Sequence, residues 1–367
     1  MSALANYAYK SEQAQLPVSV YFNEAFYAQE QLRLFKAGPR YIGHELMVPN
    51  VGDYQVLADQ GRSQILKRTE QEVVLLSNIC RHRQALMLHG RGNSPNITCP
   101  LHRWTYDNDG TLIGAPHFSH TPCLALQKTL LTRWNGMLFE ANRDIATDLQ
   151  GLSVASTWDF SGYLFDHAQV TEYACNWKTF IEVYLEDYHV NAFHPGLGHF
   201  VDCAELKWEF SDWYSVQTVG IHKTLDCPGS AVYQRWHQEI KRFYQGNPPA
   251  KGAVWMVYFP NIMVEWYPQA LIISTVIPCG PQKTRNVVEY YYPEEVLWFE
   301  PELIAAQQAA YHETAKEDEE ICLRMEAGRR ALYEAGSNQI GPYQSPMEDG
   351  MQHFHQFIRK IMVDDIN

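Results

Sequence analysis

The sequence predicts an α+β fold in two parts, a small antiparallel β domain and a larger domain in which helices flank an antiparallel sheet. Three observations predict it. Short apolar runs separated by Gly, Asp and Asn fill residues 40–140, as in strands joined by turns. Longer apolar runs follow between residues 253 and 295. Residues 301–335 then read as one long helix, with Pro301 in its first turn and Gly336 at its end.

The same pattern predicts the domain boundaries. Residues 1–38 form an N-terminal arm packing on the larger domain, with a helix near Glu24–Phe35 that Gly38-Pro39 closes. Residues 39–150 form the β domain, where "YDNDGTLIG" indicates a hairpin turning at Asp109-Gly110. Residues 151–367 form the larger domain. With 46% hydrophobic residues in a chain of 367, both domains can bury a core.

Composition excludes several classes of function. The net charge of −13 argues against nucleic acid as a partner, because phosphate binding needs a basic surface. No run approaches 18 consecutive apolar residues, so we expect no membrane span. The N-terminus lacks a basic start followed by an apolar run, which favours the cytoplasm. The eight cysteines are dispersed, so Cys/His pairs indicate metal ligands before disulfides.

A first group of metal ligands lies in the β domain. Cys80-x-His82 is followed, after 16 intervening residues (83–98), by Cys99-x-x-His102. Each loop supplies one thiolate and one imidazole, which suits a two-iron cluster with both thiolates on one iron and both imidazoles on the other, the Rieske [2Fe–2S] arrangement. A structural zinc site is the alternative.

The cluster stretch is also unusual in charge. Residues 80–104 contain no Asp or Glu but four arginines, and residues 39–103 carry eight Lys/Arg against five Asp/Glu, hence +3 in a chain of −13. Positive charge near a cluster stabilises its reduced state and offers a docking face to an acidic electron donor.

A second group of candidate ligands follows a predicted helix over residues 176–189. His189 and His194 would lie about 140° apart on a regular helix and could not share a metal, so the helix must break or widen before "HPG" (194–196). Two histidines and one carboxylate form the facial triad of non-haem Fe(II) oxygenases. Glu186 lies on the same helix face as His189. Position alone leaves the third ligand open among Glu313, Glu317, Asp318, Glu319 and Glu320.

Together these stretches resemble the oxygenase (alpha) component of the Rieske non-haem iron oxygenases, the ring-hydroxylating oxygenase superfamily. "NICRHRQ…CPLHRWTYDNDGTLIGAP" resembles the family's cluster segment, and "NWKTFIEVYLEDYHVNAFHPG" resembles its iron-binding helix. "KEDEEICLRMEAG" resembles the segment that supplies the third ligand, which points to Asp318. "GPYQSPMEDGMQHFHQFIRK" resembles a C-terminal signature of the branch with choline, carnitine and betaine-type monooxygenases.

The resemblance implies a ligand set and an assembly. The residues it assigns are Cys80, His82, Cys99 and His102 for the cluster, and His189, His194 and Asp318 for the mononuclear Fe(II). It implies that Glu186 bridges the mononuclear site to a cluster histidine, His102, of a neighbouring subunit. Electrons then cross a subunit interface, which implies a homotrimer. The catalytic domain is expected to be a helix-grip, START-like fold.

The implied function is the terminal oxygenase component of an electron-transfer system. A separate ferredoxin or flavin/iron–sulfur reductase supplies the electrons, because the chain has no Gly-x-Gly-x-x-Gly fingerprint and meets NAD(P)H only through that partner. With O₂ as co-substrate, the protein would hydroxylate or oxidatively N-demethylate a small molecule, with a quaternary ammonium compound favoured. The alternatives are an aromatic ring-hydroxylating enzyme and, from another class, a Rieske electron carrier without oxygenase activity.

The sequence identifies no substrate-binding residue. Aromatic residues are dense in 208–214, 255–267 and 290–292. They could hold a methylated ammonium by cation–π attraction, stack on an aromatic ring, or simply fill a sheet core. The chain also departs from the family pattern: Gln84 and Arg103 stand where Gly is common, Leu101 where Tyr is, and Val183 where Asn is. None of these departures removes a ligand.

Overall fold

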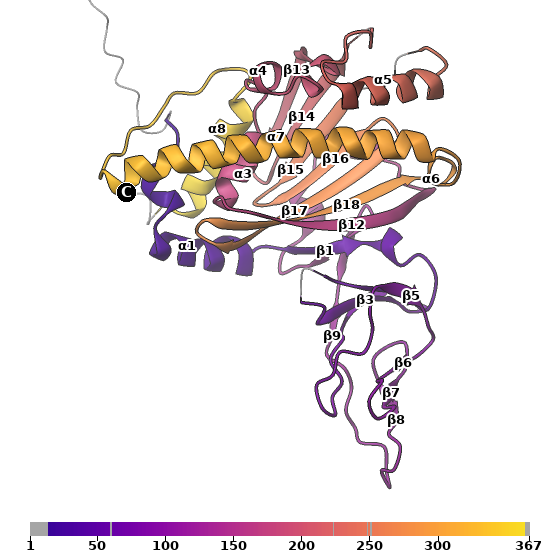
Figure 1. The fold of residues 1–367 in the computed structure, drawn as a ribbon. Helices are drawn as coiled ribbons and strands as arrows, with labels where there is room; N and C mark the ends of the chain where they lie inside the picture. Colours follow the sequence, from indigo (N-terminus) through magenta and orange to yellow (C-terminus); the bar gives the residue numbers. More distant parts are fainter. Residues whose placement is uncertain (1–13, 59–60, 223, 248, 250–251, 364–367) are drawn as a thin grey trace, which may run out of the picture. The chain divides into compact units, whose positions relative to one another are not determined.

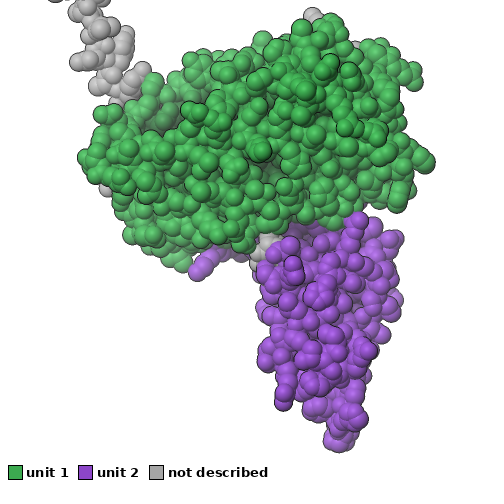
Figure 2. Space-filling view, in the orientation of Figure 1, with its two compact units in different colours: residues 1–35, 153–367 green, residues 36–152 purple. Residues whose placement is uncertain are grey.

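The computed structural model describes residues 14–58, 61–222, 224–247, 249 and 252–363. Within these residues the chain forms two compact units, coloured separately in Figure 2, one from residues 1–35 and 153–367 and the other from residues 36–152. Residues 1–13 of the predicted arm and residues 364–367 lie outside the described part. We call the first of these the catalytic unit and the second, residues 36–152, the cluster unit.

The cluster unit is built from antiparallel strands, as the turn-rich sequence predicts. Its largest sheet has the order β5-β2-β3-β4-β9, and two three-stranded sheets have the orders β1-β11-β10 and β6-β7-β8. The expected hairpin joins β7 and β8, with Gly110 at a φ of +88° in its turn. The elements are β1 Arg40–His44, η4 Glu45–Met47, β2 Asp53–Val56, β3 Gln64–Arg68, β4 Val73–Ser77, β5 Arg91–Asn93, β6 Ile97–Thr98, β7 Thr105–Tyr106, β8 Leu112–Gly114, β9 Lys128–Leu130, β10 Thr132–Trp134, β11 Met137–Glu140 and α2 Ile145–Asp148.

The catalytic unit is organised around one seven-stranded antiparallel sheet of order β12-β18-β17-β16-β15-β14-β13 (Figure 1). The strands are β12 Tyr163–Tyr173, β13 Val201–Ser211, β14 Tyr214–Ile221, β15 Ala253–Tyr258, β16 Ile262–Tyr267, β17 Ala270–Gly280 and β18 Lys283–Pro293. Pairing runs without a break from Gln217 through Trp255, Glu265 and Ile272 to Tyr290, so these five residues form one row across the sheet. Directly paired residues point to the same face of a sheet.

Helices cover this sheet and confirm the predicted α+β class. The long helix α7 crosses one face of the sheet (Figure 1), and α5 packs beside it. The predicted ends of α7 are correct: Pro301 lies in its first turn, and Gly336 follows its end with a φ of +64°. The helices are η2 Val18–Tyr21, α1 Glu24–Glu30, η3 Gln31–Lys36, η5 Ser153–Ser156, α3 Trp177–Tyr184, α4 Val190–Phe193, η6 Leu197–His199, α5 Ala231–Phe243, α6 Glu294–Phe299, α7 Pro301–Glu334 and α8 Asp349–Ile361.

The described part of the N-terminal arm packs on the catalytic unit. Apolar residues from Leu16 to Leu34 share a buried cluster with α3, α8 and the sheet. The helix expected near Glu24–Phe35 is α-helical to Glu30 and continues as a π-helix to Lys36. A fully buried ion pair, Glu30 Oε1 to Lys178 Nζ at 2.6 Å, joins the arm to α3.

Candidate iron sites and the central cavity

The helix that carries the two candidate histidines is shorter than its sequence period indicates. The prediction of one helix over residues 176–189 is wrong, because α3 ends at Tyr184 and the short α4 begins only at Val190. Glu186 turns back and accepts a hydrogen bond from the backbone N–H of His189 at 3.1 Å. Such local side-chain bonds compete with helical ones and end the helix.

This break brings the second histidine beside the first. His194 follows α4 with a φ of −107° and a ψ of 86°, outside the helical range, and leads into Pro195-Gly196. Gly229, with a φ of +72°, lies against this turn, where an added Cβ would be 1.7 Å from the carbonyl oxygen of Pro195. The turn therefore requires glycine at position 229.

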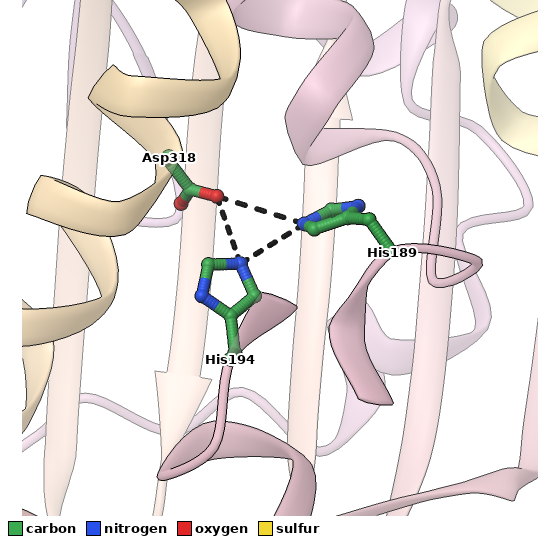
Figure 3. Close-up of side chains that lie close together, drawn as sticks. All are labelled: His189, His194 and Asp318. Carbon is green, nitrogen blue, oxygen red and sulfur yellow. Dashed lines mark hydrogen bonds and ion pairs between the residues drawn. The ribbon is translucent and has the colours of Figure 1, made fainter. Parts of the chain in front are cut away.

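His189, His194 and Asp318 converge on one point (Figure 3). The Nε2 atoms of the two histidines are 3.0 Å apart, and Asp318 Oδ1 lies 3.0 Å from His194 Nε2 and 3.6 Å from His189 Nε2. Metal–ligand bonds of about 2.1 Å at right angles would separate two ligand atoms by about 3.0 Å. The three atoms are thus spaced as neighbouring ligands on one face of a metal ion.

The other nitrogen of each imidazole is held by a carboxylate. Glu186 Oε1 contacts His189 Nδ1, and Glu317 Oε2 lies 2.7 Å from His194 Nδ1. Metal-bound histidines commonly donate their second N–H to a carboxylate, which fixes the ring and its tautomer. The sequence left five acidic residues of α7 as candidates for the third ligand. Of these, Asp318 faces the Nε2 atoms of both histidines, and Glu317 contacts the opposite nitrogen, Nδ1, of His194.

The charge of this group fits a divalent cation. Burial alone would lower the pKa of His189, but Asp318 and Glu186 outweigh it and raise this pKa to about 10. Burial would raise the pKa of Asp318, but the two histidines lower it. The same excess of carboxylates that favours protonated imidazoles favours a metal ion at the point where the three ligand atoms meet.

In the cluster unit, the four predicted cluster ligands lie at the tips of two loops. Cys80 and Cys99 are each 2% exposed, and their side chains interact directly. The rings of His82 and His102 have centroids 4.7 Å apart. His82 Nδ1 is buried and has no hydrogen-bond partner among the described residues, as expected for an atom reserved for a metal. Two thiols and two imidazoles, one of which has a buried nitrogen without a hydrogen-bond partner among the described residues, fit a [2Fe–2S] cluster of the Rieske type.

The two loops repeat one backbone pattern. In each loop the cysteine carbonyl accepts a hydrogen bond from the N–H four residues later, Gln84 at 3.1 Å and Arg103 at 3.1 Å. These two residues have φ angles of 52° and 60°, in the region that favours glycine. The departures from the family's glycines therefore leave the turns in place, with Gln84 and Arg103 in a strained left-handed backbone conformation.

The surroundings of the cluster residues are asymmetric. Trp104 stacks on His82 at 4.9 Å, whereas His102 is exposed. Tyr106 places its hydroxyl 3.6 Å from Cys80 Sγ. The arginines of the stretch, Arg81, Arg83, Arg91 and Arg103, are all exposed.

The His189/His194/Asp318 group opens into a cavity between the sheet and α7, which we call the central cavity. It holds about 950 Å³ of empty space, its opening to solvent included. Four acidic residues line it, Glu186, Asp187, Glu265 and Asp318, together with aromatic side chains from the sheet, α5 and α7. The described lining contains no Lys or Arg. This chemistry suits a small cation.

Sequence reasoning missed two of these acids. Asp187 is 2% exposed and Glu265 is 3% exposed, so both are buried carboxylates. The signal for Glu265 was a single acid inside the apolar run "IMVEWY". Of the aromatic segments, 255–267 contributes Trp255 and Tyr267 to the cavity, whereas Trp208 bonds the Pro346 carbonyl and Trp213 packs on α8.

Comparisons with known proteins match both units. Residues 160–364 match the model of the ring hydroxylating alpha subunit (catalytic domain), and residues 40–125 match that of the Rieske [2Fe–2S] domain. A putrescine 2-hydroxylase of Ralstonia nicotianae is 61% identical, with 95% of this chain and 96% of the relative covered. A putrescine 2-hydroxylase of Bordetella bronchiseptica is 53% identical over 95% of this chain and 84% of the relative.

Solved structures share the fold. The quaternary ammonium Rieske monooxygenase CntA, in complex with an inhibitor, superposes with a TM-score of 0.75 at 18% identity, and the alignment covers 96% of both chains. No helix in the described part of the chain is long and apolar enough to span a membrane.

Proposed function

The chain belongs to the ring hydroxylating alpha subunit family with a Rieske domain, and on this premise we propose that it hydroxylates a short aliphatic diamine, putrescine or a close analogue. It is the terminal component of a Rieske oxygenase, an oxidoreductase that uses O₂ to hydroxylate a small substrate. The match over residues 160–364 to a catalytic domain removes the alternative of a pure electron carrier.

The observation that carries the substrate proposal is the 61% identity to a putrescine 2-hydroxylase over 95% of this chain. The central cavity supports it, because an acidic and aromatic lining without Lys or Arg attracts a cation and gives an aromatic acid no counter-ion. In the overall reaction one oxygen atom of O₂ enters a C–H bond and the other leaves as water, with two electrons and two protons supplied. We place the new hydroxyl on C2.

A quaternary ammonium substrate, which the sequence favoured, is the second candidate. The aromatic lining and the 26% identity to a choline monooxygenase of Beta vulgaris favour it. However, Gln217 Oε1 and Asn286 Oδ1, both in the cavity lining and buried, have no hydrogen-bond partner among the described residues. A primary ammonium has N–H groups to donate to such acceptors, and a trimethylammonium has none.

The protein holds a Rieske cluster and a mononuclear iron. We assign the cluster to Cys80, His82, Cys99 and His102, and the mononuclear iron to His189, His194 and Asp318. When bound, the cluster supplies one-electron transfer and the mononuclear iron supplies activation of O₂. The chain's own contribution is to orient the two imidazoles through Glu186 and Glu317, and to line the cavity with acidic and aromatic side chains that attract a cation.

The family implies an electron-donating partner and a multimeric assembly. We propose a ferredoxin or flavin/iron–sulfur reductase as the donor and a homotrimer as the assembly. In this assembly Glu186, which contacts His189 Nδ1, connects the mononuclear site to the exposed His102 of a neighbouring subunit. The exposed arginines around the cluster ligands would meet the acidic donor.

A product assay under ¹⁸O₂ tests the substrate. The protein, a surrogate reductase and NADH are incubated with putrescine, other diamines, choline, carnitine, betaine and aromatic acids, and products are identified by mass spectrometry. We expect hydroxylated putrescine with one labelled oxygen. Hydroxylation or demethylation of a quaternary amine or an aromatic acid, without any diamine product, contradicts the proposal. Product must be measured, since uncoupled turnover also consumes O₂.

A further inference from the structure

One carboxylate in the central cavity has no role at the iron sites. Glu265 stands in the middle of β16 and is 3% exposed. It belongs to the row that runs from Gln217 to Tyr290 across the sheet, and so it shares a face with Trp255 on the neighbouring strand. Both side chains line the cavity.

Tyrosine hydroxyls orient this carboxylate without neutralising it. Tyr311 donates to Glu265 Oε1 at 3.0 Å, and Tyr267 donates to Oε2 at 3.0 Å. The Tyr267 hydroxyl is in turn fixed by the indole N–H of Trp255 at 2.9 Å. An ionised carboxylate offers about four acceptor sites, so about two remain for a ligand.

Among the described residues, no Lys or Arg side chain meets this charge. The cavity lining as described holds neither Lys nor Arg. A buried carboxylate without a cationic partner is costly. Burial, and to a smaller extent Asp318, raise the pKa of Glu265 to about 7, although hydrogen bonds from the two tyrosines lower it. A cation that entered the cavity would remove this cost.

The walls around Glu265 are of the kind that binds ammonium groups. Tyr233, Trp236, Trp255 and Tyr267 line the cavity, and Tyr267 makes edge contacts with Trp236 at 6.4 Å and with Trp255 at 6.1 Å between ring centroids. Aromatic faces attract a cation, most strongly where water is excluded.

The distance to the mononuclear site suits a short chain. Tyr311, which bonds Glu265, and Asp318 lie seven residues apart on α7, so both face the cavity. Two turns of helix separate them by about 10 Å of rise. A molecule held by its end at Glu265 would therefore present carbons a few bonds away to the iron ligands.

We propose that Glu265 binds a primary ammonium group of the substrate and thereby selects amines and sets which carbon is hydroxylated. This inference rests on the proposed function and names the residue that carries its substrate preference. Glu265 is a specificity residue in this proposal, with Tyr267 and Tyr311 as its positioning residues.

The test compares Glu265→Gln with a matched control. Gln keeps the size and the tyrosine contacts but removes the charge. The control is Glu289→Gln: Glu289 is also buried, at 4% exposed, and accepts from Tyr291 at 2.7 Å, but its place beside Tyr290 on β18 puts it on the other face of the sheet. For each variant KM, kcat and iron content are measured, and putrescine binding is measured by calorimetry without O₂.

For Glu265→Gln we expect KM and Kd for putrescine to rise about 30-fold or more, as when one member of a buried charge pair is removed. Iron content should stay at the wild-type value. Glu289→Gln should stay within about twofold of wild type, since Glu289 is not among the described residues that line the central cavity. Glu265→Asp keeps the charge and should recover part of the affinity, which separates loss of charge from loss of fold.

Unchanged putrescine affinity in a correctly folded, iron-loaded Glu265→Gln overturns the inference, as does an equal loss in the Glu289 control. If the wild-type protein oxidises a different amine, the proposed function fails, and the same comparison on that amine still decides the role of Glu265. If it oxidises only neutral or anionic compounds, both proposals are wrong.

Discussion

Replacement of Asp318 with alanine should remove the mononuclear iron and leave the cluster. In the structure Asp318 Oδ1 is the carboxylate oxygen that faces both Nε2 atoms, at 3.0 and 3.6 Å. The neighbouring carboxylates of Glu186 and Glu317 contact the opposite nitrogens of the same rings. Without Asp318 two imidazoles remain, and no described carboxylate is placed to complete the facial triad.

The expected change is one iron per chain. A protein with a two-iron cluster and a mononuclear site holds three, so Asp318→Ala should hold two. The cluster's visible spectrum should persist, because its ligands lie in the other compact unit. Iron is released with acid and counted with a ferrous chelator, and the spectrum of the same sample is recorded before release.

Glu317→Gln is the matched control for this experiment. Glu317 is adjacent on α7 and also contacts an iron-site histidine, but at the outer nitrogen, His194 Nδ1, at 2.7 Å. Loss of such an outer partner costs about 10–100-fold in metal affinity, so the variant should still reach three irons per chain in excess ferrous iron. Three irons in Asp318→Ala would refute the assignment and point to Glu317 or Glu313 as the third ligand.

Three further variants test other parts of the structure. Glu186→Gln should keep all three irons in excess ferrous iron but slow electron transfer from cluster to mononuclear site by about tenfold or more in single-turnover kinetics, and normal turnover would exclude a bridging role. Burial would raise the pKa of Glu182, but Arg329 and His355 lower it to about 2 from an ordinary 4.5. The ionised Glu182 therefore stabilises the folded protein by about 3 kcal/mol above pH 4.5, and this contribution is lost as the pH falls toward 2. Glu182→Gln should lower the free energy of unfolding by about that amount at pH 7 and flatten its decline below pH 4.5 in urea titrations; a decline as steep as wild type would contradict the linkage. Gly229→Ala must displace the Pro195 carbonyl and should reduce mononuclear iron occupancy, whereas Gly246→Ala, with a φ of +82° and nothing within 4 Å, should cost only about 1 kcal/mol of stability.

The parts of the protein that could be predicted from sequence are those set by short-range spacing. Cys80 and His82, and Cys99 and His102, each lie on one tight loop, where the spacing of the side chains is fixed by a few backbone bonds. The ends of α7 follow from the local chemistry of Pro301 and Gly336. The presence of Gln84 and Arg103 at positions where the family has glycine could be read from the sequence. The backbone strain at these positions could be recognised only from their φ angles.

The segment with the candidate iron-site histidines shows where local reasoning fails. Its apolar period continues to residue 188, yet α3 ends at Tyr184. The last apolar position of the period, Tyr188, is 59% exposed, whereas Leu185, Asp187 and Val190 are buried in a turn in which Glu186 contacts His189. Glu186 and His189 were predicted to share a helix face; they lie in contact, but in a turn and not on a helix.

The residues that we propose to bind the substrate could not be predicted from the sequence, for a different reason. Glu265 and Gln217 lie in one row only because β14, β15 and β16 pair in one register, and a shift by one residue would turn Glu265 to the other face. Tyr311 reaches the same carboxylate from a helix 46 residues further along the chain. Iron ligation can be inferred from sequence because it depends on a few residue types at short spacing, whereas recognition of an ammonium depends on side chains that only tertiary pairing brings together. A buried acid in an apolar strand, facing an oxygenase cavity whose described lining holds no Lys or Arg, is thus a physical sign of an amine substrate that no local motif carries.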